Sequence, residues 1–234
     1  MLDFPLIGKV FLLLVPSIAL GGLGAWLGRN LKSKAAITVL VIAELMTLCV
    51  FSCATWAANT GLALVLMFAF TFMTGLTVGP ALNYYRKSLG WQTVAFAFVA
   101  TAAITAAAGT VGYYLGGYVT NSPLGFLLLL GLTILLGLMF VVTIFRLGSR
   151  ARILTGILGS LLFSVYILYD FARTATGPNT WENAMSITVS LYLNMMNLLL
   201  QLLSILAETQ KDSLLHGVQM VASAVEPLIH LWPG

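Results

Sequence analysis

Two acidic residues lie inside apolar stretches of the sequence, where a carboxylate finds little water. Glu44 lies in the middle of the stretch 35–58, and Asp170 lies near the end of the stretch 152–172. An ionised group in such surroundings costs about 3 kcal/mol or more unless it is paired or hydrated. Both acids are therefore candidate functional groups.

Amide and hydroxyl side chains accompany the second acid. Asn194 and Asn197 lie in the next apolar stretch along the chain. Tyr166 and Tyr169 lie four residues and one residue before Asp170. A buried amide needs a hydrogen-bond partner, so we expect Asn194 to meet Asp170 in the interior. Two interpretations are open: an ion or proton site, or a structural hydrogen bond between helices of about 1 kcal/mol.

The composition defines the surroundings in which these groups act. Of 234 residues, 60% are hydrophobic and 8% are charged, and the mean hydropathy is +1.01. Soluble domains carry about 25% charged residues, so most of this surface faces a lipid bilayer. This excludes a soluble enzyme, a secreted disulfide scaffold, a disordered regulator and a nucleic-acid binder. Eleven Lys and Arg oppose seven acids, a small excess that we interpret as loop charges that set orientation and not as a phosphate-binding surface.

Seven apolar stretches are long enough to cross a bilayer as helices, which takes about 20 residues. Short connections rich in Gly, Pro, Asn, Lys and Arg separate them. The sequence therefore predicts an all-α polytopic membrane protein, because a barrel would show short alternating segments. Gly112 and Gly116 predict that the fourth helix packs closely in the interior. The predicted helices are 5–28, 35–58, 61–84, 91–117, 123–146, 152–172 and 182–207.

The loop charges predict an orientation. Nine Lys and Arg fall in alternate loops and the C-terminal tail, against Lys9 and Arg173 on the other side. By the positive-inside rule, the N-terminus lies outside and the tail inside. The nine are Arg29, Lys32, Lys34, Arg86, Lys87, Arg146, Arg150, Arg152 and Lys211.

The last 27 residues form a separate feature. Residues 1–207 are predicted to be the transmembrane domain and 208–234 an amphipathic tail, whose apolar residues from Leu214 recur with a helical period. Such a helix lies on a membrane or against a partner. His216 and His230 fall on its polar face, where we expect them to be solvated.

The cysteines predict no metal site. Cys49 and Cys53 lie four residues apart in an apolar stretch, far in sequence from either histidine. They are therefore expected to be small buried hydrophobic residues and not ligands. Neither a cofactor nor a metal is predicted.

Three stretches resemble the Bax inhibitor-1 family. They are VYILYD at 165–170, SLYLNMMNL at 190–198 and TGLTVGPALN at 74–83. The resemblance implies a seven-helix bundle with the last helix at its centre, in a bacterial inner membrane or a eukaryotic organelle. It also associates the chain with pH-sensitive calcium leak, suppression of cell death and, in bacteria, modulation of a membrane-bound AAA protease.

One departure from the family bears on the site. The leak that the resemblance implies uses a pair of aspartates, one on each of the last two helices, that share a proton. The first position matches Asp170, but the second is Asn194, which cannot ionise. The site thus keeps a hydrogen bond and loses one charge.

Two functional hypotheses follow, and neither is enzymatic. In the first, the chain is a pH-sensitive calcium or other cation leak channel gated by protonation of Asp170, with Glu44, Tyr166, Tyr169, Asn194 and Asn197 as further site residues. In the second, it is a non-catalytic accessory subunit of a larger membrane complex, a protease or a respiratory assembly, that binds through its tail. We expect a bacterial inner membrane, with an organelle membrane such as the mitochondrial inner membrane as the alternative.

Overall fold

The computed structural model describes the backbone of residues 4–229 and, within that range, the side chains of all residues except 212 and 214–229. The described chain is helical and contains no strand. Seven of its helices are long and apolar enough to span a membrane, which confirms the predicted fold class. The helices are α1 (Leu6–Gly28), α2 (Lys34–Trp56), α3 (Thr60–Leu89), α4 (Trp91–Tyr114), the short α5 (Gly116–Thr120), α6 (Leu124–Ile144), α7 (Ser149–Thr176) and α8 (Trp181–Ile229).

Local sequence sets several of these boundaries. Ser33 and Asn59 cap α2 and α3, each accepting a hydrogen bond from a backbone N–H three residues on. Gly90 has a φ of 83°, a left-handed conformation that glycine adopts readily. This single residue joins α3 to α4, so the last turn of α3 lies beside the first turn of α4.

Several predicted helix ends differ from the structure. The helix α7 extends beyond the predicted 152–172 at both ends, and α8 continues past 207. The third helix runs to Leu89 and not to 84, because the charges of Arg86 and Lys87 end the apolar stretch without ending the helix. The fourth ends at Tyr114, and the separate α5 follows it, where one helix was predicted to 117.

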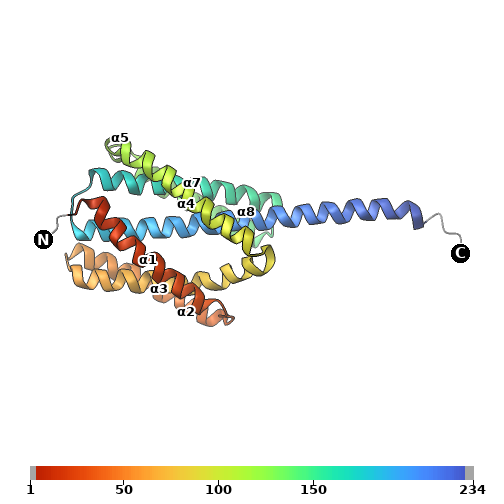
Figure 1. Cartoon of the computed structure of the whole chain (residues 1–234), viewed down its shortest axis with the longest axis horizontal. Coiled ribbons are helices and arrows are strands. Elements are labelled where there is room, and N and C mark those ends of the chain that lie inside the picture. The colour runs from red at the N-terminus through yellow and green to blue at the C-terminus, as the bar shows by residue number, and fades with distance from the viewer. Residues whose placement is uncertain (1–3, 230–234) are drawn as a thin grey trace.

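The helix α8 lies at the centre of the bundle (Figure 1). It contacts α1, α2, α3, α4 and α7. Its residues Tyr192, Leu198, Leu199 and Leu203 are almost fully buried. The arrangement is the one that the Bax inhibitor-1 resemblance implies.

Close helix contacts depend on glycine. A Cβ at Gly75 of α3 would lie 2.1 Å from the Gly21 carbonyl oxygen of α1, and one at Gly112 of α4 would lie 2.1 Å from the Leu168 carbonyl oxygen of α7. The close packing predicted for the fourth helix is therefore confirmed. The prediction that this helix lies in the interior was wrong, because one face of α4 is not covered by other helices and Phe96 is among its exposed residues.

The predicted burial of both cysteines was also wrong. Cys49 and Cys53 are exposed on α2, a peripheral helix that is buried over only a small part of its length. A lipid-facing surface and a protein core are both apolar. The residue types around the cysteines therefore could not distinguish the two environments.

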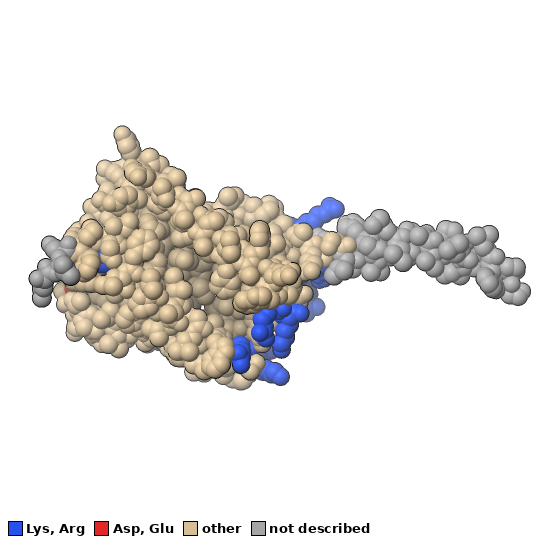
Figure 2. Space-filling view, viewed as in Figure 1, with Lys and Arg blue, Asp and Glu red and all other residues tan. Residues whose placement is uncertain are grey.

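The Lys and Arg side chains lie near the two ends of the bundle. Lys and Arg cluster at the end from which α8 emerges, which we call the basic end (Figure 2). The opposite end, where α7 connects to α8, is called the far end. The helix α8 continues beyond the basic end as one helix to Ile229. The amphipathic character predicted for 208–234 and the positions of His216 and His230 lie outside the described side chains.

Candidate functional site

The carboxylate of Asp170 is buried between α7 and α8. Its side chain is 1% exposed. The oxygen Oδ2 accepts hydrogen bonds from Asn194 Nδ2 at 2.7 Å and from Ser190 Oγ at 2.9 Å. Since Ser190 and Asn194 are one helical turn apart on α8, one face of the central helix supplies both donors.

A cation completes the environment of this carboxylate. Arg173 lies one turn further along α7, and its Nη1 is 3.6 Å from Asp170 Oδ1. The arginine side chain is 31% exposed, so it reaches from the buried carboxylate toward the far end of the bundle. Each oxygen of Asp170 therefore has a partner within the chain.

The arrangement pairs one carboxylate with an amide, a hydroxyl and a guanidinium. The structure brings Asp170 and Asn194 together as the sequence predicted, and an amide stands where a second carboxylate would share a proton. No group of three or more His, Cys, Asp or Glu side chains that could hold a metal ion occurs among the described residues. The geometry fits a hydrogen-bonded ion pair between the last two helices.

The other predicted residues of this cluster have different neighbours. The Tyr166 ring stacks on Phe163, with 6.4 Å between ring centroids. The Tyr169 hydroxyl points to α6, where a Cβ on Gly125 would lie 2.8 Å from it. The side chain of Asn197 is half-buried. Among the described residues, none of the three donates a hydrogen bond to Asp170.

Glu44 belongs to a second polar cluster, between α2 and α3. Its Oε1 accepts from Thr74 Oγ1 at 2.6 Å, and its Oε2 accepts from Thr77 Oγ1 at 3.1 Å. Within the described part of the chain, no Lys or Arg forms an ion pair with it. The two acids that the sequence singled out thus lie in separate clusters.

Sequence reasoning missed several partners in these clusters. Arg173 was counted only as a loop charge, although its position three residues after Asp170 on one helix could have indicated the ion pair. Ser190, four residues before Asn194, carried the same kind of signal. Thr74 and Thr77 are some 30 positions from Glu44, and no local spacing links them to it.

These features define the class of protein: an integral membrane protein of seven spanning helices, with a paired carboxylate between its last two helices. The family model "Inhibitor of apoptosis-promoting Bax1" matches residues 5–211. The chain therefore belongs to the Bax inhibitor-1 family.

Bacterial relatives share most of this region. An uncharacterized membrane protein of Vibrio cholerae is 33% identical over 155 residues, which are 64% of this chain and 66%, just under two thirds, of the relative. YccA of Escherichia coli K12, named a modulator of FtsH protease, is 30% identical over 155 residues, 66% of this chain and 68% of YccA. An uncharacterized protein of Pseudomonas aeruginosa is 30% identical over 204 residues, 82% of this chain and 84% of the relative.

Proposed function

We propose that this chain is a non-catalytic accessory subunit that modulates a larger membrane complex. The complex that we propose is a membrane-bound protease of the FtsH type. The observation that carries the proposal is the environment of Asp170. Both of its oxygens are occupied by side chains of the same protein, so the carboxylate serves helix packing. The name of YccA supports the choice of partner.

The test reconstitutes an FtsH-type protease in proteoliposomes and follows degradation of a membrane-protein substrate. We expect the chain to change the rate of degradation in proportion to its molar ratio to the protease. The Asp170→Asn variant keeps an acceptor oxygen in place and should act like the native chain. An unchanged rate at saturating amounts of chain would overturn the proposal.

A pH-sensitive calcium or other cation leak is the second candidate. It is supported by one observation: an acidic side chain that is 1% exposed lies within a spanning helix, where an ionisable group is a candidate for ion or proton transfer. In this candidate, protonation of Asp170 breaks its pairing with Arg173 and loosens α7 from α8.

Calcium flux into liposomes at acidic and alkaline pH tests this candidate. A leak predicts pH-dependent flux that Asp170→Asn removes. Asn194→Asp restores a second carboxylate 24 residues after the first, as in the aspartate pair of the family, and should strengthen the pH dependence. Equal, background flux in all three proteins would exclude the leak.

We also propose that the basic end faces the cytoplasm of a bacterial inner membrane, with the N-terminus outside. Two observations support this orientation: the clustering of Lys and Arg at that end (Figure 2) and the positive-inside rule. Reporter fusions active on only one side of the membrane, placed at each terminus, test it. Activity of an extracytoplasmic reporter at the C-terminus would reverse the orientation.

A further inference from the structure

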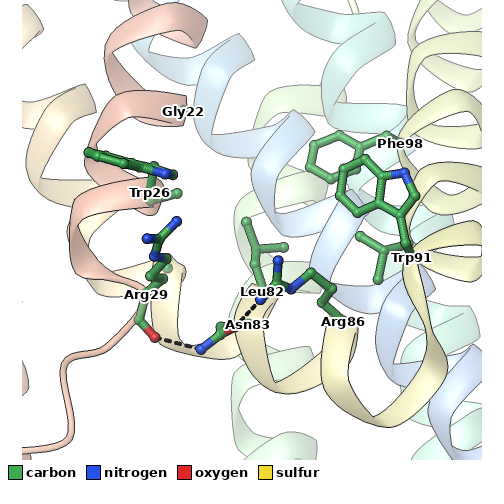
Figure 3. Close-up of a pocket in the computed structure, with 11 residues that line it drawn as sticks. Gly22, Trp26, Arg29, Leu82, Asn83, Arg86, Trp91 and Phe98 are labelled. Carbon is green, nitrogen blue, oxygen red and sulfur yellow. Dashed lines mark hydrogen bonds between the residues drawn. The ribbon is translucent and has the colours of Figure 1, made fainter.

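A groove of about 310 Å³ opens at the basic end between α1, α3 and α4. Arg29 and Arg86 lie at its edge with Trp26 and Trp91, as Figure 3 shows. Arg29 directly follows α1, Arg86 lies in the last turn of α3, and Trp91 begins α4. The polar part of the groove is therefore at the helix ends, the level at which lipid headgroups lie.

Deeper in the groove the lining becomes apolar. Gly22 and Phe98 lie about two helical turns further into the bundle than Arg29 and Trp91 (Figure 3). The groove thus combines two cations at the interface with apolar walls toward the hydrocarbon core. This order matches a phospholipid, whose phosphate lies above its acyl chains.

The two arginines are positioned by neutral groups. The Arg29 guanidinium lies 4.8 Å from the centroid of the Trp26 ring, and Arg86 Nη2 donates to Asn83 Oδ1 at 3.3 Å. Asn83 Nδ2 in turn donates to the Arg29 carbonyl oxygen at 2.8 Å. This hydrogen bond joins the end of α1 to the C-terminal part of α3. In the described part of the chain, no carboxylate forms an ion pair with either arginine, so the positive charge is left uncompensated.

We infer that this groove binds one anionic glycerophospholipid, with its phosphate between Arg29 and Arg86 and an acyl chain along the wall formed by Gly22 and Phe98. Arginine suits a phosphate because its planar guanidinium donates two parallel hydrogen bonds. Tryptophan at the rim suits the headgroup level. The uncapped N-terminus of α4 adds partial positive charge at the same rim.

A second groove provides an internal comparison. It lies between α1, α4 and α7 near the far end and has a volume of about 370 Å³, but no charged residue lines it. Volume alone therefore does not distinguish the two grooves. Of these two grooves, the one between α1, α3 and α4 is lined by two arginines, whose charges select an anionic lipid.

The experiment uses the full chain in detergent micelles, with bromine on the acyl chains of the added lipid to quench tryptophan. Brominated phosphatidylglycerol should quench in a saturable manner, and brominated phosphatidylcholine should not. The double variant Arg29→Gln/Arg86→Gln should bind phosphatidylglycerol roughly thirty-fold more weakly. Lys32→Gln/Lys87→Gln removes the same charge from the same end outside the groove and should bind like the native chain.

A second pair of variants tests the acyl wall. Outside the local helix backbone, no atom lies within 4 Å of a Cβ built on Gly22 or on Gly137 of α6, so a side chain can begin at either position without a clash. Gly22→Leu fills the groove and should abolish saturable quenching, whereas Gly137→Leu should not. Equal binding by Gly22→Leu and the native chain would overturn the proposal.

Two further outcomes would also overturn it. Equal losses in the arginine and lysine double variants would indicate attraction to surface charge in general and not a site. Displacement of the lipid by millimolar inorganic phosphate would indicate a site for the free anion. Retention of the lipid under phosphate supports a phospholipid site, because the acyl chain then contributes to binding.

Discussion

The two ends of the bundle use cationic side chains in different ways. At the far end, Lys9 is only 6% exposed. Its Nζ donates to the Asn179 carbonyl oxygen at 3.0 Å and lies 5.3 Å from the centroid of the Trp181 ring. Arg173 faces Asp170. Both cations are thus engaged by the protein itself.

At the basic end, Arg152 forms an ion pair with Glu208, with 3.0 Å between Nη1 and Oε1, but the two arginines of the groove are not neutralised. Arg29 and Arg86 are exposed, whereas Lys9 is buried. The neighbours of these two arginines are an aromatic ring and an amide, and among the described residues no carboxylate forms an ion pair with either arginine. We therefore expect the cations at the far end to stabilise the fold, and Arg29 and Arg86 in the groove at the basic end to be available to a ligand. Four substitutions test this distinction through the free energy of unfolding, measured by titration with a denaturing detergent in mixed micelles.

Asp170→Ala should have the largest effect, a loss of about 3 kcal/mol, at about 1.5 kcal/mol for each of the two hydrogen bonds to a charged acceptor. The donors of Ser190 and Asn194 lose their acceptor, and Arg173 loses its counter-charge. Asp170→Asn keeps one acceptor oxygen and should lose less. Unfolding of the alanine variant at the native detergent concentration would contradict a stabilising role for the carboxylate.

Arg173→Met should come next, with a loss of about 1–2 kcal/mol. Asp170 keeps its two hydrogen bonds from α8 but loses its cation, and the partial exposure of Arg173 reduces the effect below that of a fully buried pair. The double variant with Asp170→Asn measures the coupling directly. Additive losses would show that the two residues do not interact.

Lys9→Met should cost about 1 kcal/mol, because methionine fills a similar volume but cannot donate to the Asn179 carbonyl oxygen or interact with the Trp181 ring as a cation. Lys34→Met is the control, since Lys34 is exposed at the other end. If Lys9→Met is as stable as the native chain, Lys9 does not stabilise the fold and in this respect resembles Arg29 and Arg86.

Arg29→Gln/Arg86→Gln should have the smallest effect on stability, within about 0.5 kcal/mol of the native chain without added lipid. The same variant is expected to lose phosphatidylglycerol binding. A loss of stability as large as that of Arg173→Met would remove the distinction between the two ends.

Much of the fold could be predicted because its signals are local. An apolar stretch of membrane-spanning length and a charged connection are properties of consecutive residues, so seven helices and the charge asymmetry followed from the sequence. The contact between Asp170 and Asn194 could also be predicted, since consecutive helices joined by a short connection lie side by side.

Contacts between distant segments could not be predicted in this way. Arg29 and Arg86 are 57 positions apart, and the net charge alone favoured an interpretation in which basic residues only set orientation. Their approach depends on the glycine contacts between α1 and α3 and on the one-residue turn at Gly90. None of these is visible as a spacing in the sequence.

The sequence by itself determined the membrane environment, the number of spanning helices and the absence of a second carboxylate at Asn194. Only the tertiary structure decided which apolar faces meet lipid, as at Cys49 and Cys53, which partner neutralises Asp170, and which arginines stay uncompensated. The physical reason is that hydropathy and charge belong to single segments. Burial and pairing depend on how the faces of several helices are rotated toward one another.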